Sequence, residues 1–97
     1  MNSGELRVDV DGNVVRVVGE LDVATAPLVT AGFRLAERSE VRLDLSGLTF
    51  IDVRGLDAVV DAVEQLRGAG HAVRVVGATG LIRRVFELTG HASLLSD

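Results

Sequence analysis

The residues of this chain that could carry out catalysis are few and lie in separate segments. Ser46 has no neighbouring histidine that could activate its hydroxyl group as a nucleophile. His71 and His91 stand alone in segments that read as loops, so neither indicates a metal site. Asp44 and Asp52 could act as a general acid and base, but a strand end and a helix start explain these carboxylates as well or better. The sequence therefore predicts neither an enzyme nor a metal centre.

A glycine-containing loop, Gly77-Ala78-Thr79-Gly80, stands between an expected strand and an expected helix, where a loop can cradle a phosphate group. It lacks the Gly-Lys-Ser/Thr ending of a P-loop and the glycine spacing of a dinucleotide-binding fingerprint. The same residues suit a plain turn in which Thr79 caps the next helix. We favour the turn, and we expect no nucleotide or other cofactor.

The segment from Leu43 to Leu56, LDLSGLTFIDVRGL, carries the most informative pattern. Asp52 stands where a helix should begin, and its carboxylate can accept hydrogen bonds from free N–H groups of the first turn. Gly55 weakens a helix by roughly 1 kcal/mol relative to alanine. Arg54 places a cation at the positive end of the helix, at a cost of about 0.3–1 kcal/mol. Because these two residues break local rules, we interpret this helix start as a surface shaped for binding.

The outer face of the same helix allows two interpretations. A solvated acidic face would explain it, and so would a docking face on which small alanines between carboxylates let another protein approach closely. The sequence does not decide between them. The residues outside the expected core stripe of this helix are Asp57, Ala58, Asp61, Ala62, Glu64 and Gln65.

The elements that position these residues follow the order strand, strand, helix, strand, helix, strand, helix. We expect strands over residues 6–10, 13–18, 41–45 and 72–76, with Ser46-Gly47 breaking the third. Helices are expected from Asp22 or Thr25 to about Arg38, from Asp52 to a Gly-Ala-Gly stop at residues 68–70, and from Thr79 to Gly90. A final short piece at Leu94-Leu95 is expected to dock on the rest.

Three local expectations follow from the same patterns. Asp11-Gly12 predicts a tight hairpin between the first two strands. The valine density of the second strand predicts burial on both of its faces. The apolar positions of the first helix are expected at Leu28, Ala31, Phe33 and Leu35, and those of the third helix at Leu81, Ile82, Val85, Phe86 and Leu88.

The alternation of strands and helices predicts an α/β fold with a mostly parallel central sheet and right-handed crossovers. We expect about four to five strands, an N-terminal hairpin, and three or more helices packed on the sheet. The 97 residues allow one domain, which we place over residues 1–97.

Composition limits the partners. The net charge is −4 and the only aromatic residues are three phenylalanines, so a nucleic-acid partner is not expected. No apolar stretch approaches the ~20 residues that span a bilayer, and the first residues lack the pattern of a signal peptide. The absence of cysteine fits a reducing compartment. We therefore expect a soluble, cytoplasmic protein without direct membrane insertion.

Two segments carry a resemblance to a known family: GELDVATAPLV, residues 19–29, and LDLSGLTFIDVRGLDAVV, residues 43–60. Together they resemble the STAS domain, above all that of bacterial anti-sigma factor antagonists, and the resemblance extends over essentially the whole chain. It implies a STAS-like fold and a non-enzymatic regulatory protein. It also implies a partner, an anti-sigma factor with a kinase-type ATP-binding fold, whose sequestration frees a sigma factor.

The resemblance further implies a phosphorylation switch at a serine or threonine directly after the aspartate, usually in an Asp-Ser-Ser-Gly or Asp-Ser-Thr-Gly run. The corresponding run here is Asp52-Val53-Arg54-Gly55. Val53 holds the position of the phosphorylated residue, can accept no phosphate, and is not acidic. The switch is therefore expected to be lost, or moved to Ser46 or Thr49, while the binding scaffold remains.

The partner-binding surface is expected at the start of the second helix. Arg54 should be held by an acid, either Asp22 or Asp52 in this chain or an acidic patch on the partner; an arginine that arrived by drift is the alternative. Two other functions stay open: an accessory subunit of a transporter ATPase, and a scaffold that forms homo- or hetero-oligomers with STAS proteins. The residues expected at the surface are Asp22, Asp52, Val53, Arg54, Gly55, Asp57, Ala58 and Asp61.

Overall fold

The computed structural model describes residues 5–36 and 39–96 of the chain. In these ranges four strands alternate with helices after an opening hairpin, as the sequence predicts. The elements in chain order are β1 (Leu6–Asp11), β2 (Val14–Leu21), α1 (Ala26–Leu35), β3 (Glu40–Ile51), α2 (Val53–Gly68), β4 (Ala72–Val76), α3 (Gly80–Leu88) and the short 3₁₀ helix η1 (Ala92–Leu94).

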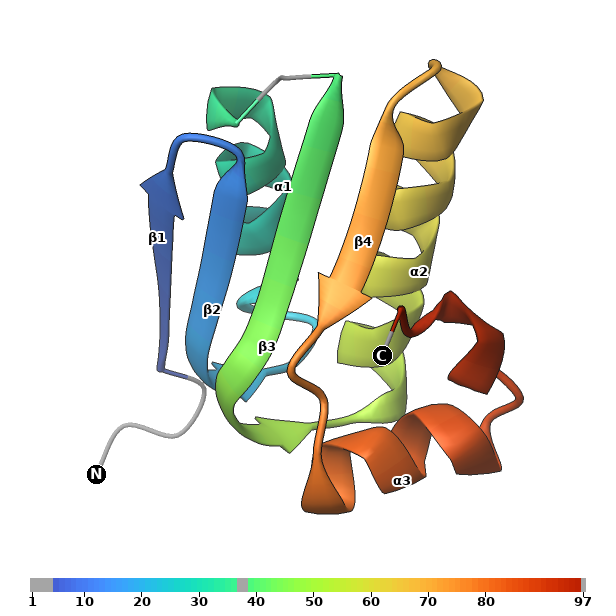
Figure 1. The fold of residues 1–97 in the computed structure, drawn as a ribbon. Helices are drawn as coiled ribbons and strands as arrows, with labels where there is room; N and C mark the ends of the chain where they lie inside the picture. The colour runs from blue at the N-terminus through green and yellow to red at the C-terminus, as the bar shows by residue number, and fades with distance from the viewer. Residues whose placement is uncertain (1–4, 37–38, 97) are drawn as a thin grey trace.

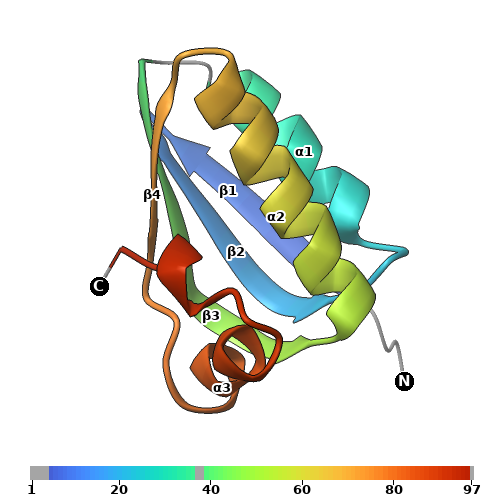
Figure 2. The same ribbon diagram turned by 90° about the vertical axis from the view of Figure 1, so that its right-hand side faces the viewer.

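The four strands form one sheet in the order β1-β2-β3-β4. β1 pairs with β2 antiparallel, whereas β2, β3 and β4 run parallel to one another. Helices α1 and α2 lie side by side on one face of the sheet, and no helix of the described residues covers the other face (Figures 1 and 2). We call the second face the open face. α3 lies beyond the end of the sheet where β3 finishes (Figure 1). The predicted α/β class, the mostly parallel sheet and the N-terminal hairpin are confirmed.

The hairpin between β1 and β2 is confirmed, but its loop lies one residue later than predicted. Asp11 pairs with Val14, which leaves Gly12 and Asn13 as the two-residue loop. Gly12 has a φ of 60°, and no residue other than glycine has a positive φ in the described ranges. A positive φ at the first loop residue alone is typical of a type II′ turn, which favours glycine at that position. Asp11 therefore belongs to the strand.

β2 is an interior strand, as expected, but the prediction that both of its faces are buried is wrong. Val15 and Val17 point toward the helices and have no exposed surface. On the opposite face Arg16 is exposed, and Val14 and Val18 are only half-buried. The reason is that both long helices cover the same side of the sheet (Figure 2).

The predicted break at Ser46-Gly47 is also wrong. β3 is twelve residues long in total, and it runs through these two residues to Ile51. Gly47 pairs with Val18, and the pairing with β2 continues after two register shifts. A Cβ on Gly47 would lie 2.8 Å from a methyl carbon of Val18. The glycine therefore lets two strands approach closely inside the sheet, and it does not end the strand.

The buried face of α1 agrees with the prediction at Phe33 but differs from it at Leu28, Ala31 and Leu35. Leu28 and Leu35 are 47% and 78% exposed, whereas Val29 and Phe33 are buried. Gly32 explains the choice, because a Cβ there would lie 2.7 Å from a methyl carbon of β1. A helix face that contains glycine can lie closer to the sheet than a face lined with leucines. The helix ends at Leu35, and the expected end at Arg38 lies outside the described residues.

α2 and β4 match their predicted ranges, and Gly70 follows α2 with a φ of 96°. In α3 the predicted apolar face is partly right: Ile82 and Phe86 are buried, whereas Leu81 and Leu88 are 71% and 73% exposed. The 3₁₀ helix then returns toward β4, so the expected docking at the end of the chain is confirmed. Within residues 5–36 and 39–96, no helix has both the length and the apolar character needed to cross a bilayer.

Candidate functional site

The candidate site lies where β2 and β3 end beside each other. Leu21 pairs with Ile51 at the ends of these parallel strands, so Asp22 and Asp52 begin the two loops that follow. The N–H group of Asp52 donates a hydrogen bond to the carbonyl of Leu21 at 3.2 Å, which ties the loops together. Carboxyl ends of parallel strands are where α/β folds usually place their binding loops. The structure thus brings together Asp22 and Asp52, which the sequence only suggested as neighbours.

Asp52 caps α2 as predicted. Its Oδ1 atom accepts a hydrogen bond from the N–H group of Gly55 at 2.7 Å. This bond satisfies one of the free donors of the first turn and places negative charge at the positive helix end. The carboxylate of Asp52 is therefore held toward the backbone of its own helix.

Asp22 organises the start of α1 in a similar way. Its Oδ1 atom accepts hydrogen bonds from the N–H groups of Ala24 and Thr25 at 2.9 and 3.0 Å. Thr25 holds the N-cap position but makes no side-chain cap, and its buried hydroxyl donates to the carbonyl of Glu20 at 3.0 Å. Of the two residues that the sequence left open as caps, Asp22 supplies the acceptor.

Gly55 is buried, and the structure explains the glycine from within the chain. A Cβ at this position would lie 2.5 Å from the carbonyl oxygen of Leu21 and 3.1 Å from the Cα atom of Asp22. The first turn of α2 therefore crosses the end of β2 at a distance that only glycine allows. The close approach to β2 therefore gives this glycine a reason within the chain.

Val53 and Arg54 are the outward residues of the first turn of α2. Val53 is 57% exposed and Arg54 is also exposed. Among the described residues, Arg54 makes no ion pair or side-chain hydrogen bond. The two carboxylates expected to hold it inside the chain, those of Asp22 and Asp52, accept bonds from backbone N–H groups instead. The guanidinium group is thus available to an acid on another molecule.

The predicted mixture of alanines and carboxylates on α2 is divided between two sides of the helix. Asp57 and Asp61 are exposed, whereas Ala58 and Ala62 are half-buried because they face α1 across a shallow groove. Their small side chains let the two helices pack together. Near the site, the groove residues are Val23, Ala26, Pro27, Thr30, Ala31, Arg34 and Ala58.

Sequence reasoning missed two exposed apolar residues near the site. Val23, directly after Asp22, is 57% exposed and lines the groove beside Ala58. Phe50 precedes Asp52 by two residues in β3 and is 45% exposed. The sequence signal that could have identified them is an apolar residue close to a helix-capping aspartate. Val23, Phe50 and Val53 are thus exposed apolar residues in or next to the two loops that Asp22 and Asp52 begin.

The Gly77 loop packs against β3. A Cβ on Gly77, whose φ is 81°, would lie 2.7 Å from the Asp44 carboxylate and 2.8 Å from the Ser46 nitrogen. The Asp44 carboxylate therefore lies against this loop, where it would repel a phosphate group, and this favours the plain turn. Thr79 is the N-cap residue of α3 but makes no side-chain cap. In the part of the chain that the structure describes, no group of three or more metal-ligating side chains converges.

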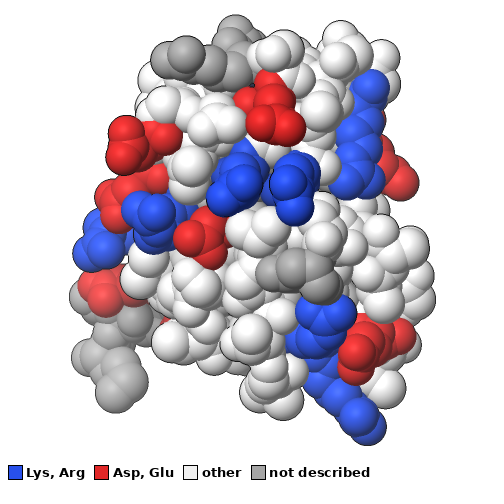
Figure 3. Space-filling model, viewed as in Figure 1, with Lys and Arg blue, Asp and Glu red and all other residues white. Residues whose placement is uncertain are grey.

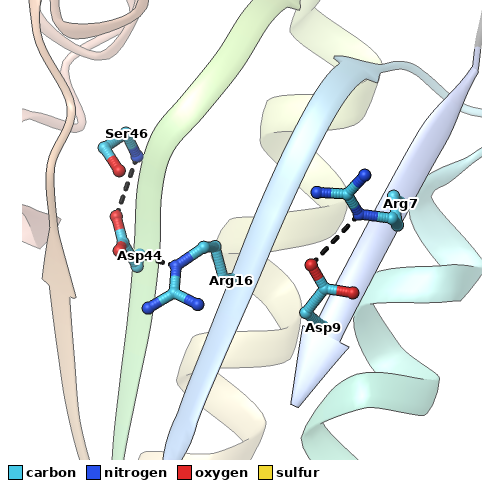
Figure 4. Close-up of polar contacts among 5 residues, drawn as sticks. All are labelled: Arg7, Asp9, Arg16, Asp44 and Ser46. Atoms are coloured by element: carbon cyan, nitrogen blue, oxygen red, sulfur yellow. Dashed lines mark hydrogen bonds and ion pairs between the residues drawn. The ribbon is translucent and has the colours of Figure 1, made fainter. Parts of the chain in front are cut away.

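The environment of Asp44 lowers the pKa of its carboxyl group. Partial burial raises the pKa, but hydrogen bonds from the backbone and side chain of Ser46 and the contact with Arg16 outweigh it. The pKa therefore lies below its ordinary value of 3.8. The Ser46 N–H group donates at 2.9 Å and the Arg16 guanidinium at 3.4 Å (Figure 4). The Arg16 contact joins β2 to β3 on the open face of the sheet.

Comparison with known proteins now places the chain in a family. Residues 5–96 match the family model described as the STAS domain. The chain belongs to the STAS domain family. Curated STAS relatives include the anti-sigma-B factor antagonist of Listeria monocytogenes, which is 30% identical over 90 residues, covering 90% of this chain and 79% of the relative. The anti-sigma-B factor antagonist of Staphylococcus aureus is 30% identical over 84 residues, covering 84% and 78%.

Solved structures agree with this STAS assignment. An anti-sigma factor antagonist from Mycobacterium paratuberculosis superposes with a TM-score of 0.74 at 27% identity, covering 95% of this chain and 82% of that chain. The unphosphorylated form of the anti-sigma factor antagonist SpoIIAA superposes with a TM-score of 0.73, covering 96% and 87%. At 19% identity the SpoIIAA likeness shows the fold alone.

Proposed function

We propose that this STAS domain is a non-enzymatic regulator that binds and sequesters an anti-sigma factor in the cytoplasm. Its curated relatives in Listeria and Staphylococcus are named anti-sigma-B factor antagonists. The observation that supports a protein partner most directly is Arg54, which is exposed beside the apolar Val53 at the capped end of α2 and pairs with no acid among the described residues. An exposed arginine next to an apolar side chain is the kind of residue that anchors protein interfaces.

The proposed contact surface is the first turn of α2 with the loop that follows β2. Asp22 and Asp52 support this surface because each carboxylate accepts hydrogen bonds from the turn that follows it, and Gly55 lets the first turn of α2 pack against the end of β2. Val53 and Arg54 would touch the partner, and Asp57, Ala58 and Asp61 would extend the contact along α2. An acidic patch on the anti-sigma factor would pair with Arg54.

We also propose that binding is constitutive. The related fold of SpoIIAA has been solved in an unphosphorylated and in a phosphorylated form. In this chain the residue after the capping aspartate is Val53, which has no hydroxyl group. A kinase-type anti-sigma factor could therefore bind this surface without being able to release itself through phosphorylation at that position.

The experiment begins with capture of the partner from the cytoplasm of the native organism, followed by titration of the purified pair. Arg54→Ser should weaken binding by roughly 1–3 kcal/mol, the scale of a lost charged hydrogen bond. Arg74→Ser is the matched control, because Arg74 is exposed on β4 away from the helices and should leave binding unchanged. Folding stability should change little in both variants.

Two results would count against the proposal. Capture of a transporter ATPase in place of an anti-sigma factor would favour the accessory-subunit function. An affinity that Arg54→Ser leaves unchanged would show that the arginine is a product of drift and that the contact lies elsewhere.

A further inference from the structure

Among the described residues, the outer edge of β1 is open, whereas the C-terminal segment binds the opposite edge of the sheet at Val75. At the β4 edge, the Ser96 N–H group donates to the carbonyl of Val75 at 2.7 Å, and the Ser96 hydroxyl accepts from the Val75 N–H group at 3.0 Å. No such contact reaches the outer edge of β1 from the other described residues, and Figure 1 shows β1 as the outermost strand. An open edge strand is a template for pairing with another chain.

The pairing with β2 determines which backbone groups of β1 point outward. The Glu20 N–H group donates to the Glu5 carbonyl at 2.8 Å, so this pair is of the hydrogen-bonded kind. Because such pairs alternate with non-bonded ones, the odd-numbered residues of β1 face β2 with their backbone groups. The backbone N–H and C=O groups of Leu6, Val8 and Val10 therefore point to the open edge.

The sequence of β1 is complementary to itself when two copies run antiparallel. If Val8 faces Val8 of a second copy, Leu6 faces Val10 and Arg7 faces Asp9. The outward-pointing residues then meet each other as hydrogen-bonded pairs, as the ladder requires. Arg7 and Asp9 become non-bonded pairs, whose Cα atoms are closer at about 4.5 Å. A shift by one residue would place Val8 opposite Asp9, and a shift by two would place Asp9 opposite itself.

Beside this edge lies an apolar surface that no other described element covers. It contains three residues of α1 that were predicted to be buried but are exposed in the structure. These residues are Leu28, Ala31 and Leu35. Together with Leu6, Val8 and Val10 they line a groove between α1 and β1. The open face behind β1 is different, since charged side chains of both signs intermingle there (Figure 3).

The position of α1 suits a second copy. A Cβ on Gly32 would lie 2.7 Å from Val8 and 3.2 Å from Val15, so α1 sits above the gap between β1 and β2. In a continuous sheet the two α1 helices would then be two strand spacings apart, about 10 Å. Helices pack at about 8–10 Å. The exposed leucines would fill the space between them.

We propose that β1 is a self-association edge and that its occupant is a second copy of this chain. Two β1 strands pair antiparallel around Val8, which joins the two sheets into one. Across the seam, Arg7 of each copy pairs with Asp9 of the other on the open face, and the α1 leucines pack on the opposite face. In each monomer Arg7 and Asp9 already lie 3.1 Å apart on the same strand (Figure 4), so both side chains are held near the seam.

A charge swap tests the register. Arg7→Asp alone and Asp9→Arg alone each place like charges across the seam and should weaken dimerisation about tenfold or more. A mixture of the two single variants should restore the dimer, because the reversed charges then face each other. The double variant should also dimerise. Sedimentation velocity measures the fraction of dimer, because it separates the dimer from the monomer of 10.2 kDa. Circular dichroism checks that each variant is folded.

A second pair of variants tests the helix contact. Leu35→Glu should prevent dimerisation, whereas Leu88→Glu, at an equally exposed leucine of α3, should not. A native chain that stays monomeric at concentrations on the order of 1 mM would overturn the proposal. So would a dimer that neither Arg7→Asp alone nor Asp9→Arg alone weakens. A Leu35→Glu variant that still dimerises, but no longer binds the anti-sigma factor or lipid vesicles, would overturn it as well. These results are independent of whether Arg54 contacts a partner.

Discussion

Two residues at the start of α2, Asp52 and Gly55, depend on each other. The Asp52 carboxylate accepts its capping bond from the Gly55 N–H group, and Gly55 lets that turn lie against the end of β2. The aspartate could be predicted as a cap from sequence alone, because a capping side chain bonds to a residue only a few positions away. The reason for the glycine was not, because the atoms that it approaches belong to Leu21, far away along the chain.

Gly55→Ala should therefore destabilise the fold by about 1–3 kcal/mol, since the new Cβ forces the backbone of α2 and β2 apart. Gly68→Ala is the matched control in the same helix. A Cβ at Gly68 meets nothing within 4 Å, so this change should be neutral or stabilising by up to roughly 1 kcal/mol. The chain has no Trp or Tyr, so urea unfolding followed by circular dichroism is the measurement. Equal effects of the two changes would contradict the close approach.

Asp44 makes a residue-scale prediction about pH. Its lowered pKa means that the folded chain favours the charged carboxylate, so this group stabilises the fold above its ordinary pKa of 3.8. That stability is lost as the pH falls through the lower, folded-state value. Asp44→Asn should cost about 0.5–1.5 kcal/mol at pH 7 and progressively less below pH 3.8.

The matched control is Asp61→Asn, since Asp61 is an exposed carboxylate on α2. It should change stability at pH 7 by less than about 0.5 kcal/mol. Unfolding titrations at several pH values give both results. A penalty for Asp44→Asn that stays constant down to low pH would show that the Ser46 and Arg16 contacts do not depend on charge.

At the scale of elements, periodicity predicted the position of helices better than their orientation. For α2 the buried face was predictable, because Leu56, Val59 and Val63 follow helical spacing and are all buried. In α1 two faces carry apolar residues at helical spacing. The face with Gly32 packs on the sheet, and the face with Leu28 and Leu35 does not. Which of the two faces is buried depends on how closely the helix can approach the sheet. That distance cannot be derived from the spacing of apolar residues in the sequence.

The orientation of α2 predicts the ranking of two substitutions. Val63 has no exposed surface, so Val63→Ala should cost about 1–3 kcal/mol through lost burial and the cavity that remains. Asp61→Ala, two residues away on the exposed side, should cost less than about 0.5 kcal/mol. Chemical denaturation of both variants checks the ranking, and the opposite order would mean that the helix is rotated from its position here.

Strand ends were harder to predict than strands. β4 was predicted to the residue, but β3 extends six residues past the expected end at Leu45. Gly47 reads locally as a breaker, whereas in the sheet it relieves a contact with Val18 of the neighbouring strand. The error arises because the partner strand lies elsewhere in the sequence.

At the scale of the whole molecule, the fold brings the capping residues Asp22 and Asp52 together. It also leaves two surfaces uncovered by the described residues, the start of α2 and the outer edge of β1. The parallel pairing of β2 with β3 places Asp22 beside Asp52, and the helix that follows presents Val53 and Arg54. The open edge of β1 lies along a different side of the sheet from α2 (Figure 1). Binding of an anti-sigma factor and pairing with a second copy can therefore be tested separately in the same molecule.

The constitutive binding proposed for this chain is tested most directly by titrating it with its anti-sigma factor in the presence and absence of ATP. The native chain should bind with the same affinity in both conditions, and its intact mass should not change. Val53→Ser is the matched variant, because it returns a hydroxyl group to the position after Asp52 and should gain a phosphate and lose binding with ATP. If the native chain gains a phosphate, for example at Ser46 or Thr49, and is released, the binding is switched after all.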